Sequence, residues 1–345
     1  MSATDVAARI TAWLASPTPR VESAEAEALA QSVFGIRAKA SVLLAERDRN
    51  FRLDDAGGRP GQVLKIHTEH ADPATLAFQN QALQHAERVA PSLPLPRLLP
   101  SLDGEIMTRW QAAAGTRHCV RLLSWQPGRP VDFNTAPAPL RRATGRLLAN
   151  TQVAFADCPI DDAPTDLPWD LMNYGALEAL LPTVTHGGLR AMCAATCRLF
   201  HDEVAPALDR LPRQVVHNDF NPDNVLADES GHLTGVIDFG DMVVAPVICD
   251  LAVACAYQLD GREEGFSQMD PLLEGYAEVL SLANEDRWLL EALVECRLAS
   301  SILIQCCREA QHPDNAAYFE KSLEVGGRRL VQAFNARRRG SARRR

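Results

Sequence analysis

The chain has 345 residues, of which 46% are hydrophobic and 23% charged, a composition that excludes a disordered protein and allows one large two-lobed unit or two domains. Its formal net charge is −9 although six arginines occupy the last nine residues, 337–345, so the remaining body carries about −15. Such an acidic body disfavours binding to nucleic acid or to anionic membranes and favours a cationic small molecule.

Cysteine usage and the apolar stretches indicate the compartment. Nine cysteines are scattered through apolar patterns, without a Cys-x-x-Cys pair or zinc-finger spacing. Buried, reduced thiols are typical of a cytoplasmic protein, which is the location we expect. The first residues lack the positive charge of a signal peptide. No apolar stretch reaches the ~20 residues that cross a bilayer, because Asp250 interrupts the longest candidate, so we expect no membrane association.

The first part of the chain predicts a strand-rich unit with one long helix. Two short helices are expected within residues 1–34, the second from Ser23 to Phe34 with Ser23 as its N-cap. The strand-like runs SVLLAERDRNFRL and QVLKIHT are joined by the turn-rich DDAGGRPG and predict a hairpin. Asp72 and Pro73 then open a long amphipathic helix. Two further strand-like runs follow, RLLPSLDGEIMTRW and RHCVRLLSWQPGRPV.

Beyond Val131 the pattern is mostly helical. Long helical patterns are predicted at residues 139–156, 188–211, 286–311 and 316–336. A strand pair interrupts them within residues 214–244.

These elements predict an α+β, bilobal architecture. The N-lobe is an antiparallel sheet with one long helix, and the larger C-lobe is mostly helical. We expect N-terminal helices at residues 1–34, the N-lobe at 35–122 and a hinge at 123–130. The C-lobe would follow at residues 131–335, and a disordered arginine-rich tail at 336–345.

Residues 217–241 carry a pattern suited to phosphoryl transfer: HNDFNPDNVL, a turn, and then GVIDFGD. That reaction needs a carboxylate to orient the attacking hydroxyl and accept its proton, and hard oxygen ligands to hold Mg²⁺ against the phosphates. In H-x-D-x-x-x-x-N and the D-F-G that follows it, the two Asp and the Asn lie at the ends of adjacent strands, so they share one mouth. We predict Asp219 as the catalytic base, Asn224 and Asp238 as Mg²⁺ ligands, and His217 as a brace for the loop. The alternative is a polar hairpin turn capped by these side chains.

Two more residues are candidates for positions around this mouth. Lys65 lies in the apolar strand VLKI, where an inward-facing lysine needs an anionic partner, and it is predicted to bind the α- and β-phosphates. The alternative for Lys65 is an exposed side chain on a strand. Asp250 opens the helix DLAVACAYQL and is either its N-cap or a hydrogen-bonding support of the catalytic loop.

HNDFNPDN…GVIDFGDMVVAPVICDLA, together with LLAERDRNF…VLKI and HCVRLLSWQPGRPV, resembles the aminoglycoside phosphotransferase/choline kinase superfamily over about residues 20–330. Within it, the chain looks most like the hydroxylysine kinases and the phosphotransferase modules sometimes fused to aminotransferases. The resemblance implies a protein-kinase-like fold, ATP or GTP with Mg²⁺, and phosphorylation of a hydroxyl group on a small, often amine-bearing molecule.

The resemblance also implies nucleotide contacts. Asn50 falls in the nucleotide-covering loop, and Leu123 to Trp125 fall at the hinge, whose backbone would meet the nucleobase. A Gly-rich loop is absent, because the glycines of DDAGGRPG read as a plain hairpin turn. In the covering loop, Arg47 or Arg49 contacts phosphate or lies at the surface. Gln79 stands where the family usually has the Glu that pairs with the lysine, and its amide can hydrogen-bond that ammonium.

The acceptor is expected to be a small amine-bearing alcohol. Too few residues separate Asp238 from Asp250 for an activation loop, so a protein substrate is disfavoured. Three carboxylates are candidate contacts to the amine: Asp170, and Glu291 and Glu295, which lie four residues apart on one helix face. The alternative is that this helix face is exposed to solvent.

Two other functions stay open, an aminoglycoside-type antibiotic O-phosphotransferase and a nucleotide-binding pseudokinase that acts as an interaction module. The intact Asp219, Asn224 and Asp238 argue against the pseudokinase. A nucleic-acid partner for the arginine tail is disfavoured by the acidic body.

Overall fold

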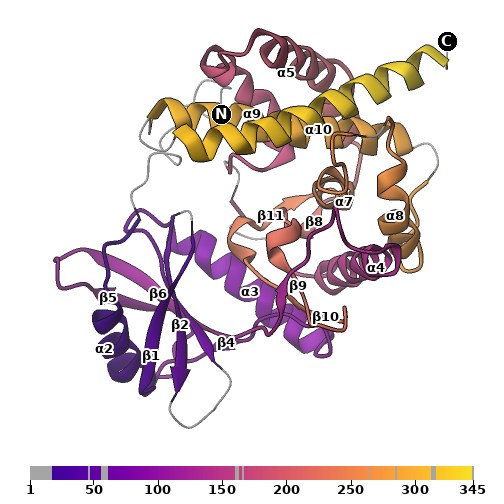
Figure 1. The fold of residues 1–345 in the computed structure, drawn as a ribbon. Coiled ribbons are helices and arrows are strands. Elements are labelled where there is room, and N and C mark those ends of the chain that lie inside the picture. The colour runs from indigo at the N-terminus through magenta and orange to yellow at the C-terminus, as the bar shows by residue number, and fades with distance from the viewer. Residues whose placement is uncertain are drawn as a thin grey trace.

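The computed structural model describes residues 18–45, 47–55, 61–159, 163–164, 167–262, 264–283, 286–311 and 316–343. The first expected N-terminal helix, and Gly57 and Gly58 of the DDAGGRPG turn, lie outside these residues. Figure 1 shows a strand-rich lobe beside a larger helical lobe, with α3 between them. All nine cysteines are buried free thiols, as expected. Within the described ranges, no helix has the length and apolar character needed to span a membrane.

The N-lobe is an antiparallel sheet in the order β1-β2-β3-β6-β4, with β5 also pairing with β6. Its strands are β1 (Ala38–Leu43), β2 (Arg49–Asp55), β3 (Gln62–Ile66), β4 (Leu98–Leu99), β5 (Thr108–Gln111) and β6 (Arg117–Ser124). The predicted β2–β3 hairpin is confirmed. The run SVLLAERDRNFRL is not one strand, because β1 ends at Leu43, β2 begins at Arg49, and the two strands pair with each other.

Two helices cover the N-lobe sheet. On one face, α2 (Ser23–Phe34) packs its buried apolar residues against those of β2, β3 and β6. Glu22 is the N-cap of α2 without a side-chain hydrogen bond, so the prediction of Ser23 as the cap is wrong by one residue. The long helix α3 (Pro73–Val89) begins as predicted, because Asp72 accepts a hydrogen bond from the backbone N–H of Ala74. Four apolar side chains of α3 pack into the core of the C-lobe and so join the two lobes: Phe78, Ala82, Leu83 and Ala86.

The C-lobe is built from helices around two short strand pairings. Its strands are β7 (Arg129–Pro130), β8 (Gln214–Val216), β9 (Val225–Ala227), β10 (Leu233–Val236) and β11 (Val243–Ala245). Its α-helices are α4 (Ala138–Phe155), α5 (Gly187–Leu199), α6 (Ala205–Leu208), α7 (Val247–Ala256), α8 (Asp270–Ala277), α9 (Arg287–Gln311) and α10 (Ala316–Arg343). Other helical turns are η1 (Leu171–Thr183), η2 (Phe200–Val204), η3 (Pro222–Asn224), η4 (Phe239–Asp241) and η5 (Ser267–Met269).

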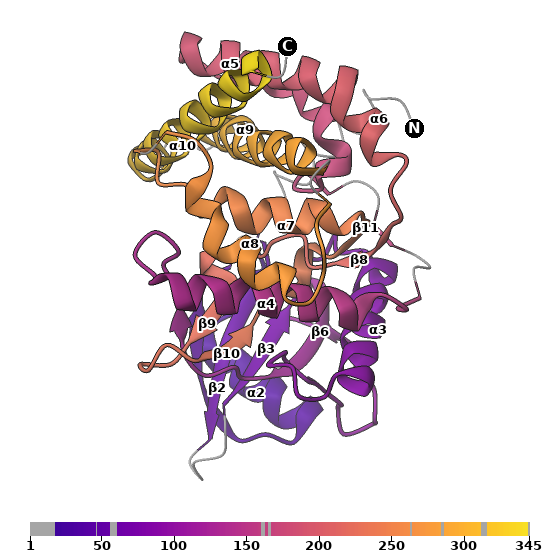
Figure 2. The same ribbon diagram turned by 90° about the vertical axis from the view of Figure 1, so that its right-hand side faces the viewer.

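Close helix packing fixes the C-lobe around α7, whose residues Ile248 to Ala256 are all buried. Helices α4 and α8 lie side by side, as Figure 2 shows, and they touch through Gly145 and Gly275. A Cβ atom on Gly145 would lie 1.9 Å from the carbonyl oxygen of Leu272, so only glycine allows this approach.

The strand pairings bring the two motif loops together. β9 pairs with β10 and with β7, while β8 pairs with β11. The chain leaves β8 into residues 217–224 and returns in β9, and it leaves β10 into residues 237–242 and returns in β11. Both loops therefore connect the same two pairings, and the second loop contacts side chains of the N-lobe.

The arginine-rich end was expected to be disordered, but α10 continues through Arg343 and runs along α9 (Figure 1). Burial explains the difference: Arg337 donates from Nε to Oε2 of the fully buried Glu295 at 2.6 Å. Arg339 makes an exposed ion pair with Glu264 at 2.9 Å. The tail is thus fixed by the side chain that it neutralises.

We predict that Arg337→Ala lowers the free energy of unfolding by about 3 kcal/mol, because it leaves Glu295 buried without its cation. Urea denaturation followed by circular dichroism measures this loss. Arg339→Ala on the same helix is the matched control and should cost less than about 1 kcal/mol, since its ion pair is exposed. Equal losses in the two variants would show that α10 is not anchored through Glu295.

Candidate active site

The loop between β8 and β9 is held by buried hydrogen bonds. Asp250 in the first turn of α7 accepts from the backbone N–H groups of Asn218 at 2.9 Å and His217 at 3.3 Å. The N-cap of α7 is Pro246, so Asp250 supports the loop and is not a helix cap. Burial raises the pKa of Asp250, while His217 and the donated hydrogen bonds oppose the rise. Asn218 takes a left-handed φ of 65°, which asparagine tolerates, and this turns the chain toward Asp219.

His217 braces the same loop, as the sequence predicted. Its Nε2 lies 2.9 Å from the carbonyl oxygen of Ile237, and its Nδ1 accepts from the backbone N–H of Asp219 at 3.2 Å. The ring also packs edge-on against Phe239, with centroids 4.6 Å apart. Burial lowers the pKa of His217, which keeps the imidazole neutral and its two nitrogens in these distinct roles.

The carboxylate of Asp219 is oriented from two sides. Its Oδ2 accepts from Nδ2 of Asn224 at 2.8 Å, and its Oδ1 accepts from Nη2 of Arg297 in α9 at 2.8 Å. The side chain of Asp219 is 20% exposed, whereas that of Arg297 is only 3% exposed. Asp219 is therefore a fixed carboxylate at an opening, which is the arrangement that a hydroxyl-orienting base requires.

Asp238 and Lys65 meet across the lobes. Lys65 Nζ lies 3.1 Å from Asp238 Oδ1, so the buried lysine has the anionic partner that its strand position demanded. Lys65 is the main cause of the lowered pKa of Asp238, whose carboxylate is thereby kept ionised. Asp238 adopts a left-handed φ of 59°, an uncommon backbone conformation that is typical of functional turns.

The predicted metal ligands lie on adjoining strand ends, because the backbone N–H of Ile237 donates to the carbonyl oxygen of Asn224 at 2.9 Å. The amide nitrogen of Asn224 is bonded to Asp219, which leaves its amide oxygen for a cation. Among the described residues, no group of three or more His, Cys, Asp or Glu side chains is placed to bind a metal. An amide oxygen and an ionised carboxylate fit Mg²⁺, which usually takes its other ligands from phosphates and water.

The two arginines of the covering loop differ in direction. Arg47 Nη2 lies 3.1 Å from Oδ1 of Asp241, in the turn that follows Asp238. Arg49 points away from the mouth, because its Nε donates to the carbonyl oxygen of Val21 at 3.1 Å. Asn50 lies beside Lys65 in the β2–β3 register, and its buried Oδ1 has no hydrogen-bond partner within the described chain. Of the two arginines, only Arg47 is therefore directed toward the site.

Gln79 occupies the expected place on α3 but has other partners than Lys65. Its Nε2 donates to the carbonyl oxygen of Gly240 at 2.7 Å, and its Oε1 accepts from Nη2 of Arg121 at 2.9 Å. The hydrogen bond that the sequence suggested between Gln79 and the Lys65 ammonium is replaced by the Lys65–Asp238 ion pair. Gln79 thus ties α3 to the Asp-Phe-Gly turn.

A buried polar chain that the sequence analysis missed continues from Gln79. Arg121, in β6, donates from Nε to Nε2 of His67 at 2.9 Å, and His67 Nδ1 lies 2.8 Å from Oδ2 of Asp48 in the covering loop. Burial lowers the pKa of Arg121 to about 10, so the guanidinium stays protonated at neutral pH. Burial, assisted by Arg121, lowers the pKa of His67 to about 4. The chain connects the covering loop to the turn that holds Asp238.

The hinge is tightly bonded to its neighbours. Leu123 is buried and pairs with Val63 of β3 and Leu98 of β4. The backbone N–H of Trp125 donates to the carbonyl oxygen of Gly61 at 3.0 Å. A nucleobase at this position would find the N–H group of Trp125 already bonded.

The predicted substrate residues have partners within the protein. Asp170 is buried and caps η1 by accepting from the backbone N–H of Met172 at 2.9 Å, and burial raises its pKa to about 7. Glu291 accepts from Nε of Arg287 at 3.0 Å. Glu295 is fully buried against Thr196 and Arg337. Glu291 and Glu295 were chosen for their shared helix face, but the residue of α9 that reaches Asp219 is Arg297.

Arg297 is the principal site residue that the sequence analysis did not find. Its guanidinium carbon lies 4.6 Å from the ring centroid of Trp169 and 5.9 Å from that of Tyr257. The signal was present, because Arg297 is followed by a long uncharged run in an apolar helix, where a charge needs a partner.

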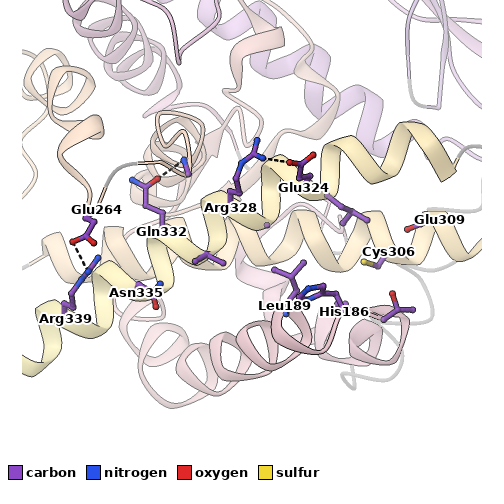
Figure 3. Close-up of a pocket in the computed structure, with 16 residues that line it drawn as sticks. His186, Leu189, Glu264, Cys306, Glu309, Glu324, Arg328, Gln332, Asn335 and Arg339 are labelled. Atoms are coloured by element: carbon purple, nitrogen blue, oxygen red, sulfur yellow. Dashed lines mark hydrogen bonds and ion pairs between the residues drawn. The ribbon is translucent and has the colours of Figure 1, made fainter.

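A separate cavity of about 590 Å³ lies between α5, α9 and α10 (Figure 3). His186 and Leu189 line one side of it. Two ion pairs that involve arginines of α10 also line it, Glu264–Arg339 and Glu324–Arg328. The residues of the motif loops are not among those that line it, so this cavity is distinct from the mouth at Asp219.

The polar chain beneath Lys65 predicts an acid-sensitive fold. The folded protein keeps His67 neutral down to about pH 4, whereas an unfolded chain protonates histidine near pH 6.5. The stability that neutral His67 contributes is therefore complete above pH 6.5 and is lost as the pH falls toward 4. We expect the urea midpoint of the wild type to fall more steeply between pH 7 and pH 5 than that of His67→Gln.

The control for this comparison is His70→Gln, because His70 is exposed on the same segment. Its pH profile should follow the wild type. Parallel profiles for the wild type and His67→Gln would contradict the role given to His67.

Comparisons with known proteins agree with this geometry. The model of a family described as "Phosphotransferase enzyme family" matches residues 43–289. Hydroxylysine kinase from Mus musculus is 25% identical over 343 residues, which cover 93% of this chain and 91% of that protein. A microcompartment-associated aminopropanol kinase has a TM-score of 0.66 at 16% identity, covering 92% of this chain and 100% of its own. Amicoumacin kinase in complex with AMP-PNP, Ca²⁺ and Ami has a TM-score of 0.66 at 16% identity, covering 88% and 94% of the two chains.

The expected superfamily resemblance and the bilobal α+β fold are confirmed. Because the family model covers more than half of the chain and includes both motif loops, the protein belongs to the phosphotransferase enzyme family.

Proposed function

We propose that this protein transfers the γ-phosphoryl group of ATP to a hydroxyl group of an amine-bearing small molecule, such as hydroxylysine or a related amino alcohol. The observation that carries the proposal is the fixed carboxylate of Asp219, oriented by Asn224 and Arg297 beside the Lys65–Asp238 pair. The likeness to a hydroxylysine kinase along nearly the whole chain supports this acceptor class.

The reaction follows from the residues at the mouth. Asp219 orients the acceptor hydroxyl and takes its proton as the oxygen forms a bond to the γ-phosphorus. The bond between that phosphorus and the β–γ bridging oxygen breaks, and the nucleoside diphosphate leaves with the electron pair. Lys65 neutralises phosphate oxygens. Asn224 and Asp238 would hold Mg²⁺, which supplies charge neutralisation to the phosphates when it is bound.

An antibiotic O-phosphotransferase is the second candidate, favoured by the fold shared with amicoumacin kinase. The hydroxylysine kinase likeness favours the amino alcohol, because it is a sequence relationship over almost all of both chains. The assay described next is run with each nucleotide and decides whether the phosphoryl donor is ATP or GTP.

The function is tested by coupled nucleoside diphosphate release with hydroxylysine, homoserine, aminopropanol and aminoglycosides, with ATP or GTP and Mg²⁺. We expect acceptor-dependent turnover with an amino alcohol or hydroxy amino acid, and its loss on chelation of the metal. Asp219→Asn should lower kcat by about 1000-fold or more, because no base remains, while nucleotide affinity measured by calorimetry is unchanged.

Asp223→Asn is the matched control, since Asp223 is an exposed carboxylate in the same turn. It should turn over at the wild-type rate. Wild-type turnover by Asp219→Asn would remove Asp219 as the base, and absence of acceptor-dependent turnover in the wild type would refute the kinase proposal.

The covering loop generates a second expectation. Arg47→Gln should raise the KM for ATP about tenfold, equivalent to about 1.4 kcal/mol, because Arg47 is the loop cation directed at the Asp-Phe-Gly turn. Arg49→Gln is the control and should leave the KM unchanged, since its guanidinium is bonded to the backbone at Val21. An equal effect of both substitutions on the KM for ATP would show that Arg47 does not contact the phosphates.

A further inference from the structure

Arg297 has more hydrogen-bonding capacity than the protein uses. Its Nη2 donates to Asp219, and a hydrogen-bonding interaction with Tyr257 helps to raise its pKa, but the buried Nε and Nη1 have no acceptor at hydrogen-bond geometry among the described residues. The residue is 2% exposed. Buried donors in native proteins are almost always paired, and an unpaired donor of a charged group is costly, so these N–H groups indicate a missing acceptor.

The surroundings of Arg297 favour an anion from the acceptor molecule. Burial by itself lowers the pKa of Arg297, but Tyr257 and Asp219 outweigh it, so the guanidinium stays charged. It lies between Trp169 and Tyr257, both of which are partly exposed and reach the surface. Arg329 of α10 lies 5.7 Å from the same Tyr257 ring, and its Nε is also buried without an acceptor in the described chain. Two cations with unpaired donors among the described residues thus lie against the partly exposed Tyr257 ring.

The chemistry of the guanidinium selects a carboxylate. Nη2 carries two N–H groups, so one can serve Asp219 while the other, with Nε or Nη1, forms a fork. Such a planar fork matches the two oxygens of a carboxylate. An acceptor held on this fork has its carboxylate close to Asp219, because Nη2 contacts both carboxylates. A hydroxyl group a few bonds from that carboxylate is then within reach of Asp219.

We propose that Arg297 binds a carboxylate of the acceptor, so that the substrate class is a hydroxy amino acid and not a simple amino alcohol. This inference rests on the proposed kinase function and narrows it. It also explains why the carboxylates first assigned to an amine, Glu291, Glu295 and Asp170, are bonded elsewhere: the acceptor is anchored through its acid group.

The test compares acceptors that differ only by the carboxylate. Hydroxylysine is compared with its decarboxylated diamino alcohol, and homoserine with its decarboxylated form, 3-aminopropan-1-ol. The wild type should prefer each acid by about 100-fold or more in kcat/KM. Arg297→Gln should lower kcat/KM for the acids about 100-fold more than it lowers kcat/KM for the amino alcohols, mainly through KM. The preference for the acids is then abolished. Arg297→Lys keeps the charge without the fork and should restore part of it.

A positioning role alone gives a different pattern. If Arg297 only holds Asp219, Arg297→Gln lowers kcat equally for both members of each pair, and the proposal is overturned. Arg287→Gln, on the same helix and bonded to Glu291, is the matched control and should keep the wild-type preference. Thermal denaturation verifies folding, and equal wild-type rates on an acid and its decarboxylated partner overturn the proposal without any variant.

Failure of the kinase proposal is distinguishable from failure of this one. If the wild type phosphorylates none of these compounds, the proposed function has failed, and binding of homoserine is then measured by calorimetry. Binding that is lost in Arg297→Gln but kept in Arg287→Gln supports the carboxylate site. Binding that is absent in the wild type, or equal in all three proteins, overturns it.

Discussion

The buried carboxylate of Asp250 accepts hydrogen bonds from the backbone N–H groups of His217 and Asn218, and the position of Asp219 depends on them. Loops are ordinarily the mobile parts of a fold, yet Asp219, the base that we propose, would have to be held within a fraction of an ångström. Here the loop is fixed from below by α7, whose residues are buried, and from the side by His217 against Ile237. The catalytic geometry is therefore a property of the C-lobe core.

Three polar contacts between the lobes converge on one short segment, residues 238–241. Lys65 of β3 meets Asp238, Gln79 of α3 meets the carbonyl oxygen of Gly240, and Arg47 of the covering loop meets Asp241. Each partner comes from a different N-lobe element. These contacts converge on the turn that holds the predicted metal ligand. A displacement of the N-lobe would therefore change the position of Asp238 more directly than that of Asp219. The buried chain from Asp48 through His67 and Arg121 strengthens this connection.

Charge is arranged differently at the surface and inside. The sequence body is acidic, but the cations that matter are buried: Lys65, Arg121 and Arg297. Net charge suggested a cationic substrate held by carboxylates, whereas the site itself presents arginines. A buried cation surrounded by low-dielectric protein interacts more strongly with a ligand than many exposed charges do. Under the proposed carboxylate contact of Arg297, local burial outweighs net charge in deciding which group of the acceptor is bound.

The sequence by itself determined the fold class, the long helix α3, the β2–β3 hairpin and the two motif loops, because hydrophobic periodicity, caps and fixed spacings are local signals. It also brought Asp219 and Asn224 into contact, since their spacing spans a single turn. Only the tertiary structure decided which face of α9 meets the loop, where Gln79 directs its amide and whether the arginine tail is ordered. Those outcomes depend on pairs far apart in the chain, such as Asp219 with Arg297 and Glu295 with Arg337, and no local pattern encodes which buried charges will neutralise each other.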